Sequence, residues 1–600
     1  MTGMMTEPRA RHSAFVHAGG ERHVDAPEER TGAQIMCDAL VREGVDVLFG
    51  IPGGAIMPFY HALWEYRGRL RHVLCRHEQG AGHAAEGYAR ATGKVGVCVA
   101  TSGPGATNLV TPIADAWMDS TPMVVLTGQV SSQLLGTNAF QEVDITGITL
   151  PITKHNYLVS DIAELPHVLR EAFYLARSGR PGPVLVDVTK DCQQARGIPD
   201  WSTELDLPLR RPTPTASEFA IERAASLLAT ARKPLLLVGN GIIQGDASEA
   251  LREFAELTGI PVITTLHGLG AFPESHPLSL GMPGMHGAVH VNRAIQSCDV
   301  LLTIGARFDD RVTGRADGFA RKARVIHVDI DAAEIGKLIR TEVGIVGDAA
   351  RVMAQLGDAL QRRGRRAPEA HAGWLAEIRG VEIERRKSRR LPAPPQSSAL
   401  SPHDVYAALD GIINAPDERE RYRVVTDVGQ HQMWAAQSIA WHRPRSHITS
   451  GGAGTMGFAV PAALGVALAC PTETVWVICG DGGFQMTNQE LATISQEAVS
   501  NLKVLVINNG YLGMVRQWQE LFNEKRYSET QLSAPNFARL AEAYGWMAMT
   551  VEHAADVHAA LATAVATPGP VLIDFRVAQD VNVFPLVPPG ESIGTMLTEA

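Results

Sequence analysis

Short, strongly apolar runs alternate with longer amphipathic segments along most of the chain. GVCVAT at 96–101, PLLLVGNG at 234–241 and VWVICGDG at 475–482 are rich in aliphatic residues, and the last two end in glycine turns. Buried parallel strands appear in sequence as near-continuous apolar runs, and the segments between these runs have the length and periodicity of helices. The pattern therefore predicts an α/β fold with doubly wound parallel sheets.

Two stretches that are rich in proline, serine and charge, at 196–217 and 385–402, are typical of linkers. A chain of 600 residues is too long for one hydrophobic core, and these linkers divide it into three parts. We expect a disordered polar extension at 1–30, a first domain at 31–195, a second domain at 212–375, a third domain at 400–585 and a C-terminal tail at 586–600.

Composition argues against several classes of protein. The formal net charge of -10 offers no general electrostatic attraction to nucleic acid, so we expect no nucleic-acid partner. The sequence has no run of about 18 uncharged apolar residues, and the first 30 residues lack the apolar core of a signal peptide, so we expect no membrane span. The seven cysteines are scattered without a C-x-x-C pair, which fits a reducing cytoplasm better than a disulfide framework or a zinc site.

The segment from Gly480 to Asn509 places a carboxylate and a carboxamide after two successive apolar strands. The crossover helix between parallel strands should bring Asp481 and Asn509 to the same sheet edge, where such sheets bind ligands. Their oxygens suit Mg²⁺, while Gly480, Gly482 and Gly483 let the backbone approach a diphosphate at a helix N-terminus. An isolated Gly-Asp-Gly is usually only a turn, but the whole pattern matches the thiamine-diphosphate motif.

From Thr31 to about Leu597 the chain resembles the large, catalytic subunits of the acetolactate synthase (acetohydroxyacid synthase) family. The resemblance implies pyrimidine-binding, FAD-binding and diphosphate-binding domains, in that order. It also implies thiamine diphosphate, Mg²⁺ and FAD as cofactors, pyruvate and 2-oxobutanoate as substrates, a homodimer or homotetramer with active sites between subunits, and a small regulatory subunit. The matching stretches include VLFGIPGGAIMPFY, RHEQGAGHAAEGYARATGKVGVCVATSGPGATNLV, GTNAFQEVD, GARFDDRVTG, DVGQHQMWAAQ, GTMGF and GMVRQWQELF.

Glu78 matches the carboxyl group that, in this family, hydrogen-bonds the thiamine pyrimidine and promotes proton removal from the thiazolium C2. Taken alone, HEQGAGH could suggest a zinc-protease helix, but His77 and His83 are six residues apart and cannot share one helix face. A lone glutamate here would otherwise be a solvated strand end. The resemblance implies that Gln141 and Lys154 also act at the reacting centre, Lys154 by attracting a 2-oxo acid carboxylate.

The remaining implied site residues form four groups, although by themselves most would be packing residues or solvated charges. The metal group is Asp481, Asn509 and the backbone oxygen of Tyr511. The thiamine-diphosphate group is Gln430, His431, Met456, Gly480, Gly482, Gly483 and Met514; the flavin group is Gly239, Gly241, Thr265, Leu266, His286, Gly305, Arg307, Asp309, Arg311, Asp329 and Asp348; the substrate pocket is Gly53, Gly54, Phe140, Val515 and Trp518.

The expected reaction is decarboxylation of pyruvate and transfer of the hydroxyethyl group to a second 2-oxo acid, in the biosynthesis of isoleucine, valine and leucine. The runner-up is a flavin-free catabolic acetolactate synthase. A simple 2-oxo acid decarboxylase, a glyoxylate carboligase and a non-catalytic homologue are further alternatives; Glu78 argues against the last two. His267, Ala453 and the pair Gly510-Tyr511 depart from residues common in the family, which leaves substrate preference and flavin affinity open.

Overall fold

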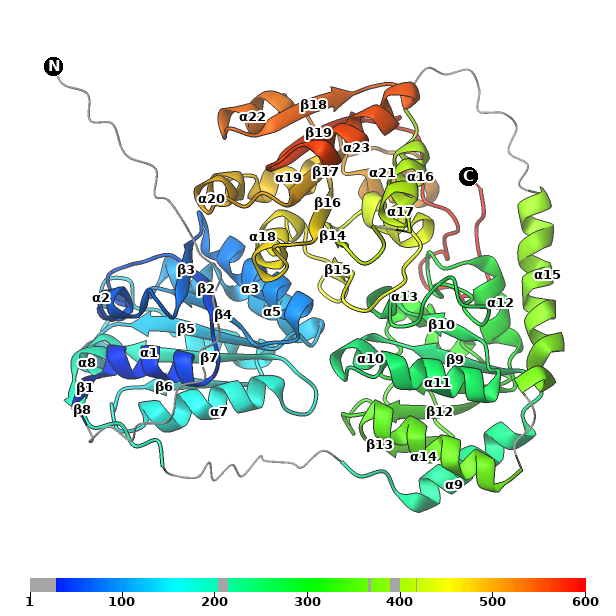
Figure 1. The fold of residues 1–600 in the computed structure, drawn as a ribbon, viewed down its shortest axis with the longest axis horizontal. Coiled ribbons are helices and arrows are strands. Elements are labelled where there is room, and N and C mark those ends of the chain that lie inside the picture. Colours follow the sequence, from blue (N-terminus) through cyan, green and yellow to red (C-terminus); the bar gives the residue numbers. More distant parts are fainter. Residues whose placement is uncertain (1–27, 203–213, 365–367, 389–399, 417, 600) are drawn as a thin grey trace.

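The computed structural model describes residues 28–202, 214–364, 368–388, 400–416 and 418–599. Three parallel sheets, each covered by helices, form three α/β domains that meet around a common junction (Figure 1). This confirms the predicted fold class. Most of the expected extension at 1–30, and parts of both expected linkers, lie outside the described residues. Among the described residues, no helix is long and apolar enough to cross a membrane.

The first domain contains a six-stranded sheet in the order β3-β2-β4-β5-β7-β6. A short antiparallel pair, β1 (Arg30–Thr31) with β8 (Arg196–Gly197), joins the two ends of the domain. The strands are β2 (Val47–Gly50), β3 (Arg71–Leu74), β4 (Gly96–Ala100), β5 (Met123–Gln129), β6 (His155–Val159) and β7 (Pro183–Thr189), and the helices are α1 (Gly32–Arg42), α2 (Met57–Tyr66), α3 (Glu78–Thr92), α4 (Pro104–Thr107), α5 (Val110–Met118), α6 (Ile145–Thr149), α7 (Leu165–Arg177) and α8 (Lys190–Gln194).

The second domain contains a five-stranded sheet in the order β10-β9-β11-β12-β13, so its strand order reverses between β9 and β11. The strands are β9 (Pro234–Val238), β10 (Val262–Thr264), β11 (Val300–Ile304), β12 (Arg324–Asp329) and β13 (Val343–Val346), and the helices are α9 (Glu218–Thr230), α10 (Asn240–Gln244), α11 (Ser248–Thr258), α12 (Val289–Ser297), α13 (Asp310–Thr313), α14 (Ala349–Arg362) and α15 (Ala372–Ser388).

The third domain repeats the six-stranded arrangement in the order β15-β14-β16-β17-β19-β18. The strands are β14 (Tyr422–Thr426), β15 (His447–Thr449), β16 (Thr474–Gly480), β17 (Leu502–Asn508), β18 (Met547–Val551) and β19 (Val571–Arg576), and the helices are α16 (Pro402–Ile413), α17 (Gln430–Ser438), α18 (Ala459–Ala469), α19 (Asp481–Thr487), α20 (Glu490–Gln496), α21 (Gly513–Phe522), α22 (Phe537–Ala543) and α23 (Val557–Ala566).

Helices α3 and α18 join the first and third domains into one hydrophobic core. Helix α18 reads AVPAALGVALA and is apolar on every face, which is typical of a helix that is buried all round. A Cβ atom at Gly87 of α3 would overlap the carbonyl oxygen of Ala462, so glycine permits the two backbones to approach closely. This contact places the start of α3 beside the helices of the third domain.

The C-terminal segment crosses from the third domain onto the second (Figure 1). Leu586 and Leu597 form an antiparallel bridge within it. The amide of Val587 donates to the carbonyl of Met285 at 2.9 Å, and the carbonyl of Glu591 accepts from the amide of Arg315 at 2.9 Å. The described part of the expected tail is therefore packed beside the segments that the sequence assigns to flavin binding.

Candidate functional site

A cavity that is open to solvent on one side lies at the carboxyl edge of the third-domain sheet. The segments that follow β14, β16 and β17 supply most of its wall, as the crossover rule for parallel strands predicts. All of the residues that line it fall between 428 and 515. The structure brings together here, from the predicted set, Gln430, His431, Met456, Gly480, Asp481, Gly482, Gly483, Asn509, Tyr511, Met514 and Val515.

Asp481 supplies a buried oxygen that suits a hard cation. Its side chain is 1% exposed, and its Oδ2 atom has no hydrogen-bond partner among the described residues. The side chain of Asn509 is fixed nearby, because its Oδ1 accepts from the Tyr511 amide at 3.2 Å and its Nδ2 donates to Gln430 Oε1 at 3.2 Å. An unsatisfied carboxylate oxygen beside a carboxamide is a donor set that fits Mg²⁺.

The affinity of this site for Mg²⁺ should depend on pH near neutrality. Burial raises the pKa of Asp481 to about 7, although backbone amides partly oppose the shift. Because the carboxyl group is protonated below that pKa, protons compete with the cation, and the dissociation constant should rise about tenfold for each pH unit below 7. Titration of Mg²⁺ in the presence of thiamine diphosphate, between pH 5.5 and 8.5, measures this; constant affinity down to pH 6 would contradict the assignment.

His431 presents a neutral ring to the same cavity. Burial lowers its pKa to about 3, so the imidazole carries no charge at physiological pH. Its Nε2 atom has no hydrogen-bond partner within the described part of the chain. A neutral imidazole can donate one hydrogen bond to a bound phosphate oxygen. It does so without burying a charge of its own.

Two buried side chains that sequence reasoning missed also shape the cavity. Asp427, directly after β14, accepts a hydrogen bond from the Gly457 amide at 3.0 Å. Gln517 accepts from Gln430 Nε2 at 2.9 Å and bonds both backbone groups of Val583. Asp427 could have been found from its position after an apolar strand, whereas the contacts of Gln517 depend on a distant segment.

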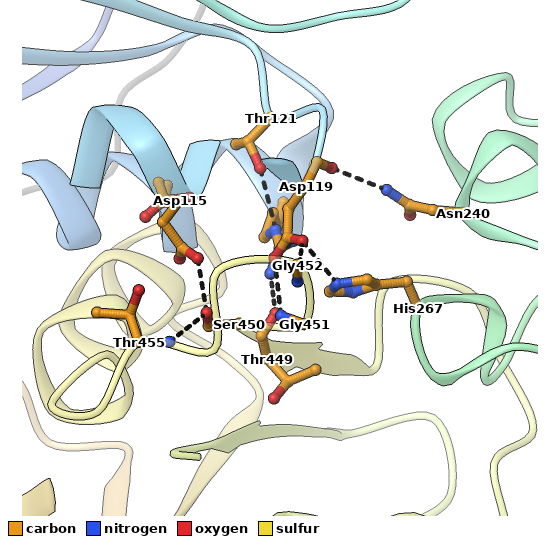
Figure 2. Close-up of polar contacts among 12 residues, drawn as sticks. Asp115, Asp119, Thr121, Asn240, His267, Thr449, Ser450, Gly451, Gly452 and Thr455 are labelled. Atoms are coloured by element: carbon orange, nitrogen blue, oxygen red, sulfur yellow. Dashed lines mark hydrogen bonds and ion pairs between the residues drawn. The ribbon is translucent and has the colours of Figure 1, made fainter. Parts of the chain in front are cut away.

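The loop that carries Met456 is held from the first domain (Figure 2). Asp115 of α5 accepts a hydrogen bond from the Ser450 hydroxyl at 2.6 Å, and that hydroxyl accepts from the Thr455 amide at 2.8 Å. Burial raises the pKa of Asp115 well above its usual range. A side chain of the first domain thus fixes the backbone immediately before a residue of the third-domain cavity.

Asp119, which follows α5, receives contacts from all three domains (Figure 2). Its carboxylate accepts from the amides of Gly451 at 3.0 Å and Gly452 at 2.7 Å in the third domain. Arg90 of the first domain donates to it at 2.8 Å, and Nε2 of His267 in the second lies 3.0 Å away. Burial acts to raise the pKa of Asp119, but His267, Arg90 and the amides outweigh it and hold the pKa well below its usual range.

Glu78, the predicted proton-transfer residue, is not among the described residues that line the third-domain cavity. Glu78 is half-buried at the start of α3, where its Oε2 accepts from Asn108 Nδ2 at 2.9 Å. Four other predicted residues of the first domain are also absent from the described residues that line the cavity: Gly53, Gly54, Phe140 and Gln141. One chain therefore presents two separate parts of the predicted centre.

The substrate-pocket residues are largely open to solvent in the single chain. Phe140 is 88% exposed and Val515 is 48% exposed. Gln141 has a φ of 61°, a left-handed conformation that is uncommon outside glycine. Trp518 packs edge-on against Phe522 with ring centroids 5.8 Å apart on α21.

Lys154 makes contacts that the sequence did not predict. Its ammonium group donates to the carbonyls of Leu175 and, at 2.6 Å, Ser178, near the C-terminus of α7. Burial lowers its pKa to about 8. These bonds stabilise the end of a helix, where cations are favoured, and attraction of a substrate carboxylate stays a prediction.

The predicted flavin residues cluster at the carboxyl edge of the second-domain sheet. Gly239 and Gly305 follow β9 and β11, between which the strand order reverses, and the Gly241 amide donates to the Gly305 carbonyl at 3.0 Å. Asp309 and Asp348 cap the N-termini of α13 and α14. Other predicted flavin residues also lie at or just after strand ends: Thr265 and Leu266 after β10, Arg307 after β11, and Asp329 at the end of β12. Arg311 lies in α13. The Nδ1 atom of His286 lies 3.1 Å from the carbonyl oxygen of Pro585.

Comparison with protein families matches all three domains of one enzyme group. The matching families are described as thiamine pyrophosphate enzyme, N-terminal TPP binding domain at 30–148, central domain at 221–356 and C-terminal TPP binding domain at 427–575.

Individual relatives match along nearly the whole chain. Acetolactate synthase of Mycobacterium bovis is 53% identical over 574 residues, covering 94% of this chain and 91% of the relative. The acetolactate synthase large subunit of Corynebacterium glutamicum is 52% identical over 573 residues, covering 94% and 90%. Chloroplastic acetolactate synthase 1 of Nicotiana tabacum is 46% identical over 585 residues, covering 96% and 86%.

Proposed function

Because the chain belongs to the acetolactate synthase family of thiamine pyrophosphate enzymes, we propose that it is a catalytic large subunit that decarboxylates pyruvate and transfers the hydroxyethyl group to a second 2-oxo acid. Pyruvate as acceptor gives 2-acetolactate, and 2-oxobutanoate gives 2-aceto-2-hydroxybutanoate, both for branched-chain amino acid biosynthesis. The observation that carries the proposal is the third-domain cavity, in which the unsatisfied oxygen of Asp481 lies among the motif glycines and Asn509.

The third domain holds the diphosphate end of the cofactor in this proposal. Asp481, Asn509 and the backbone oxygen of Tyr511 would bind Mg²⁺, and Gln430 and His431 would contact the phosphates. Thiamine diphosphate, when bound, supplies the nucleophilic carbon and the electron sink for decarboxylation. The chain itself contributes position, exclusion of water and a placed carboxyl group.

The first domain supplies that carboxyl group to the pyrimidine end. Glu78 would hydrogen-bond the pyrimidine ring, while Asn108 holds one of its oxygens. Since Glu78 does not line the cavity of its own chain, a second copy would complete each centre, and a homodimer is the smallest active unit. The solvent-exposed side chains of Phe140 and Val515 support this arrangement, because they would become buried when the two parts of the pocket meet.

We further propose that FAD binds at the carboxyl edge of the second-domain sheet. A Cβ atom at Gly239 or Gly241 would overlap the backbone of Gly305, so glycine lets the turns after β9 and β11 pack closely at the point where the strand order reverses. Open α/β sheets bind dinucleotides in the crevice at such a point. The names of relatives as large subunits support a small regulatory partner. The free cysteines fit a cytoplasmic enzyme.

Product analysis tests the proposed function. The purified protein would be stripped of flavin and incubated with pyruvate, Mg²⁺ and thiamine diphosphate, with and without FAD, and then with 2-oxobutanoate added. We expect 2-acetolactate only when FAD is present. Equal 2-acetolactate formation without FAD would favour the catabolic alternative, and acetaldehyde as the sole product would overturn the carboligase assignment.

A further inference from the structure

A buried glutamate of the third domain contacts the backbone just before Glu78. Glu490 is the first residue of α20 and is 0% exposed. Its Oε1 atom accepts hydrogen bonds from the amides of Arg76 at 3.0 Å and His77 at 3.1 Å. These two residues form the turn from β3 into α3, and Glu78 is the next residue.

The carboxylate of Glu490 is tightly enclosed at this place. Its Oε2 atom accepts from the Thr493 hydroxyl at 2.6 Å. A Cβ atom added at Gly80, in the first turn of α3, would lie 2.5 Å from Oε1. Glycine at 80 therefore leaves the space that the carboxylate needs in order to reach the two amides.

Other side-chain contacts already hold the first and third domains together here, so the contacts of Glu490 are not needed for that purpose alone. The obvious ionic partner for a buried glutamate is the guanidinium of Arg76, yet that group donates to Gln496 Oε1 at 2.8 Å and to the Leu74 carbonyl at 2.7 Å. A separate ion pair between Arg71 and Glu497, at 2.8 Å, also joins β3 to the end of α20. The carboxylate of Glu490 therefore binds the two backbone amides that immediately precede Glu78, and their position sets the position of Glu78.

We propose that Glu490 is the positioning residue for Glu78, supplied by the diphosphate-binding domain of the same chain. This inference rests on the proposed function, in which Glu78 serves the thiamine pyrimidine. Asp481 and Glu490 begin the consecutive helices α19 and α20. Each chain therefore connects its own metal-binding segment to the carboxyl group that it presents to the partner's cofactor.

Hydrogen exchange of the cofactor-free protein tests the contact itself. Glu490→Leu removes the acceptor at similar size, and the amides of Arg76 and His77 should exchange about tenfold faster or more. Glu490→Gln keeps an acceptor oxygen and should restore most of the protection. Glu497→Leu breaks the neighbouring contact between α20 and β3 and should leave these two amides unchanged.

Exchange of the thiamine C2 proton for deuterium tests the consequence. With saturating Mg²⁺ and thiamine diphosphate, Glu490→Leu should slow this exchange at least about tenfold, with cofactor affinity within about threefold of wild type. Gly80→Ala should cause the same defect, because its Cβ displaces the carboxylate, and it provides the test if Glu490→Leu does not fold.

Unchanged C2 exchange in both variants would overturn the proposal, as would unchanged amide protection. Glu490→Gln should recover the C2 exchange that Glu490→Leu loses, and failure to do so would also count against a positioning role. If the wild-type protein neither bound thiamine diphosphate nor exchanged the C2 proton, the proposed function itself would fail instead.

Discussion

Replacement of Glu78 by glutamine is expected to lower 2-acetolactate formation by about 10²- to 10⁴-fold, the usual contribution of a positioned acid or base. Glutamine keeps the size of the side chain and can still contact Asn108, but it cannot exchange a proton with the pyrimidine ring. The loss should appear in kcat, because the groups proposed to bind the diphosphate lie in the third domain. Affinity for thiamine diphosphate should change little.

Steady-state turnover and C2 proton exchange measure this effect together. Asn108→Leu provides a graded comparison, since it frees the Glu78 carboxylate without removing it, and should cost about tenfold. Glu43→Gln, a change in the α1 C-cap that contacts Arg177, serves as the matched control and should leave turnover unchanged. Turnover of Glu78→Gln within threefold of wild type would refute the proton-transfer assignment.

Replacement of Asp119 by alanine is expected to be the most destabilising change at the junction of the domains. It leaves Arg90 buried without its carboxylate, and it removes the acceptor for the Gly451 and Gly452 amides. Breaking a buried ion pair by removing one partner typically costs about 3–5 kcal/mol of unfolding free energy. The loop before Met456 should also loosen, so thiamine diphosphate should bind more weakly.

Thermal and denaturant unfolding, followed by calorimetry and fluorescence, measure the first predicted effect. Because three domains need not unfold in one step, the first transition is the relevant one. Asp246→Asn is the matched control: it removes the charge from a 3.0 Å ion pair with Arg445 and keeps a residue type that tolerates the left-handed φ of 48° at this position. Because the Asp246 side chain is 83% exposed, the change should cost under about 1 kcal/mol. Equal stability of Asp119→Ala and Asp246→Asn would contradict the account of the junction.

The third-domain cavity could be predicted because simple topology determines it. Consecutive parallel strands end at one sheet edge, so Asp481 and Asn509 had to lie close together once β16 and β17 were assigned. The same rule gathered Gly239 and Gly305 in the second domain. Residues that directly follow a parallel strand could therefore be located from the local sequence pattern alone.

Contacts between distant segments could not be predicted in this way. Asp119 and His267 are far apart in sequence, and nothing in either local pattern indicates that they meet. This contact places His267 beside a buried carboxylate. Similarly, no local signal shows that Lys154 reaches the end of α7 or that Glu490 reaches the turn before Glu78.

Complementation between two inactive variants tests the central claim, that one active centre takes Asp481 from one chain and Glu78 from another. Glu78→Gln and Asp481→Ala chains would be mixed, dissociated and reassociated, and 2-acetolactate formation would be measured. A mixed dimer should contain one intact centre, so random pairing should recover about a quarter of wild-type activity. Activity that stays at the level of the separate variants, although mixed dimers have formed, would contradict the claim.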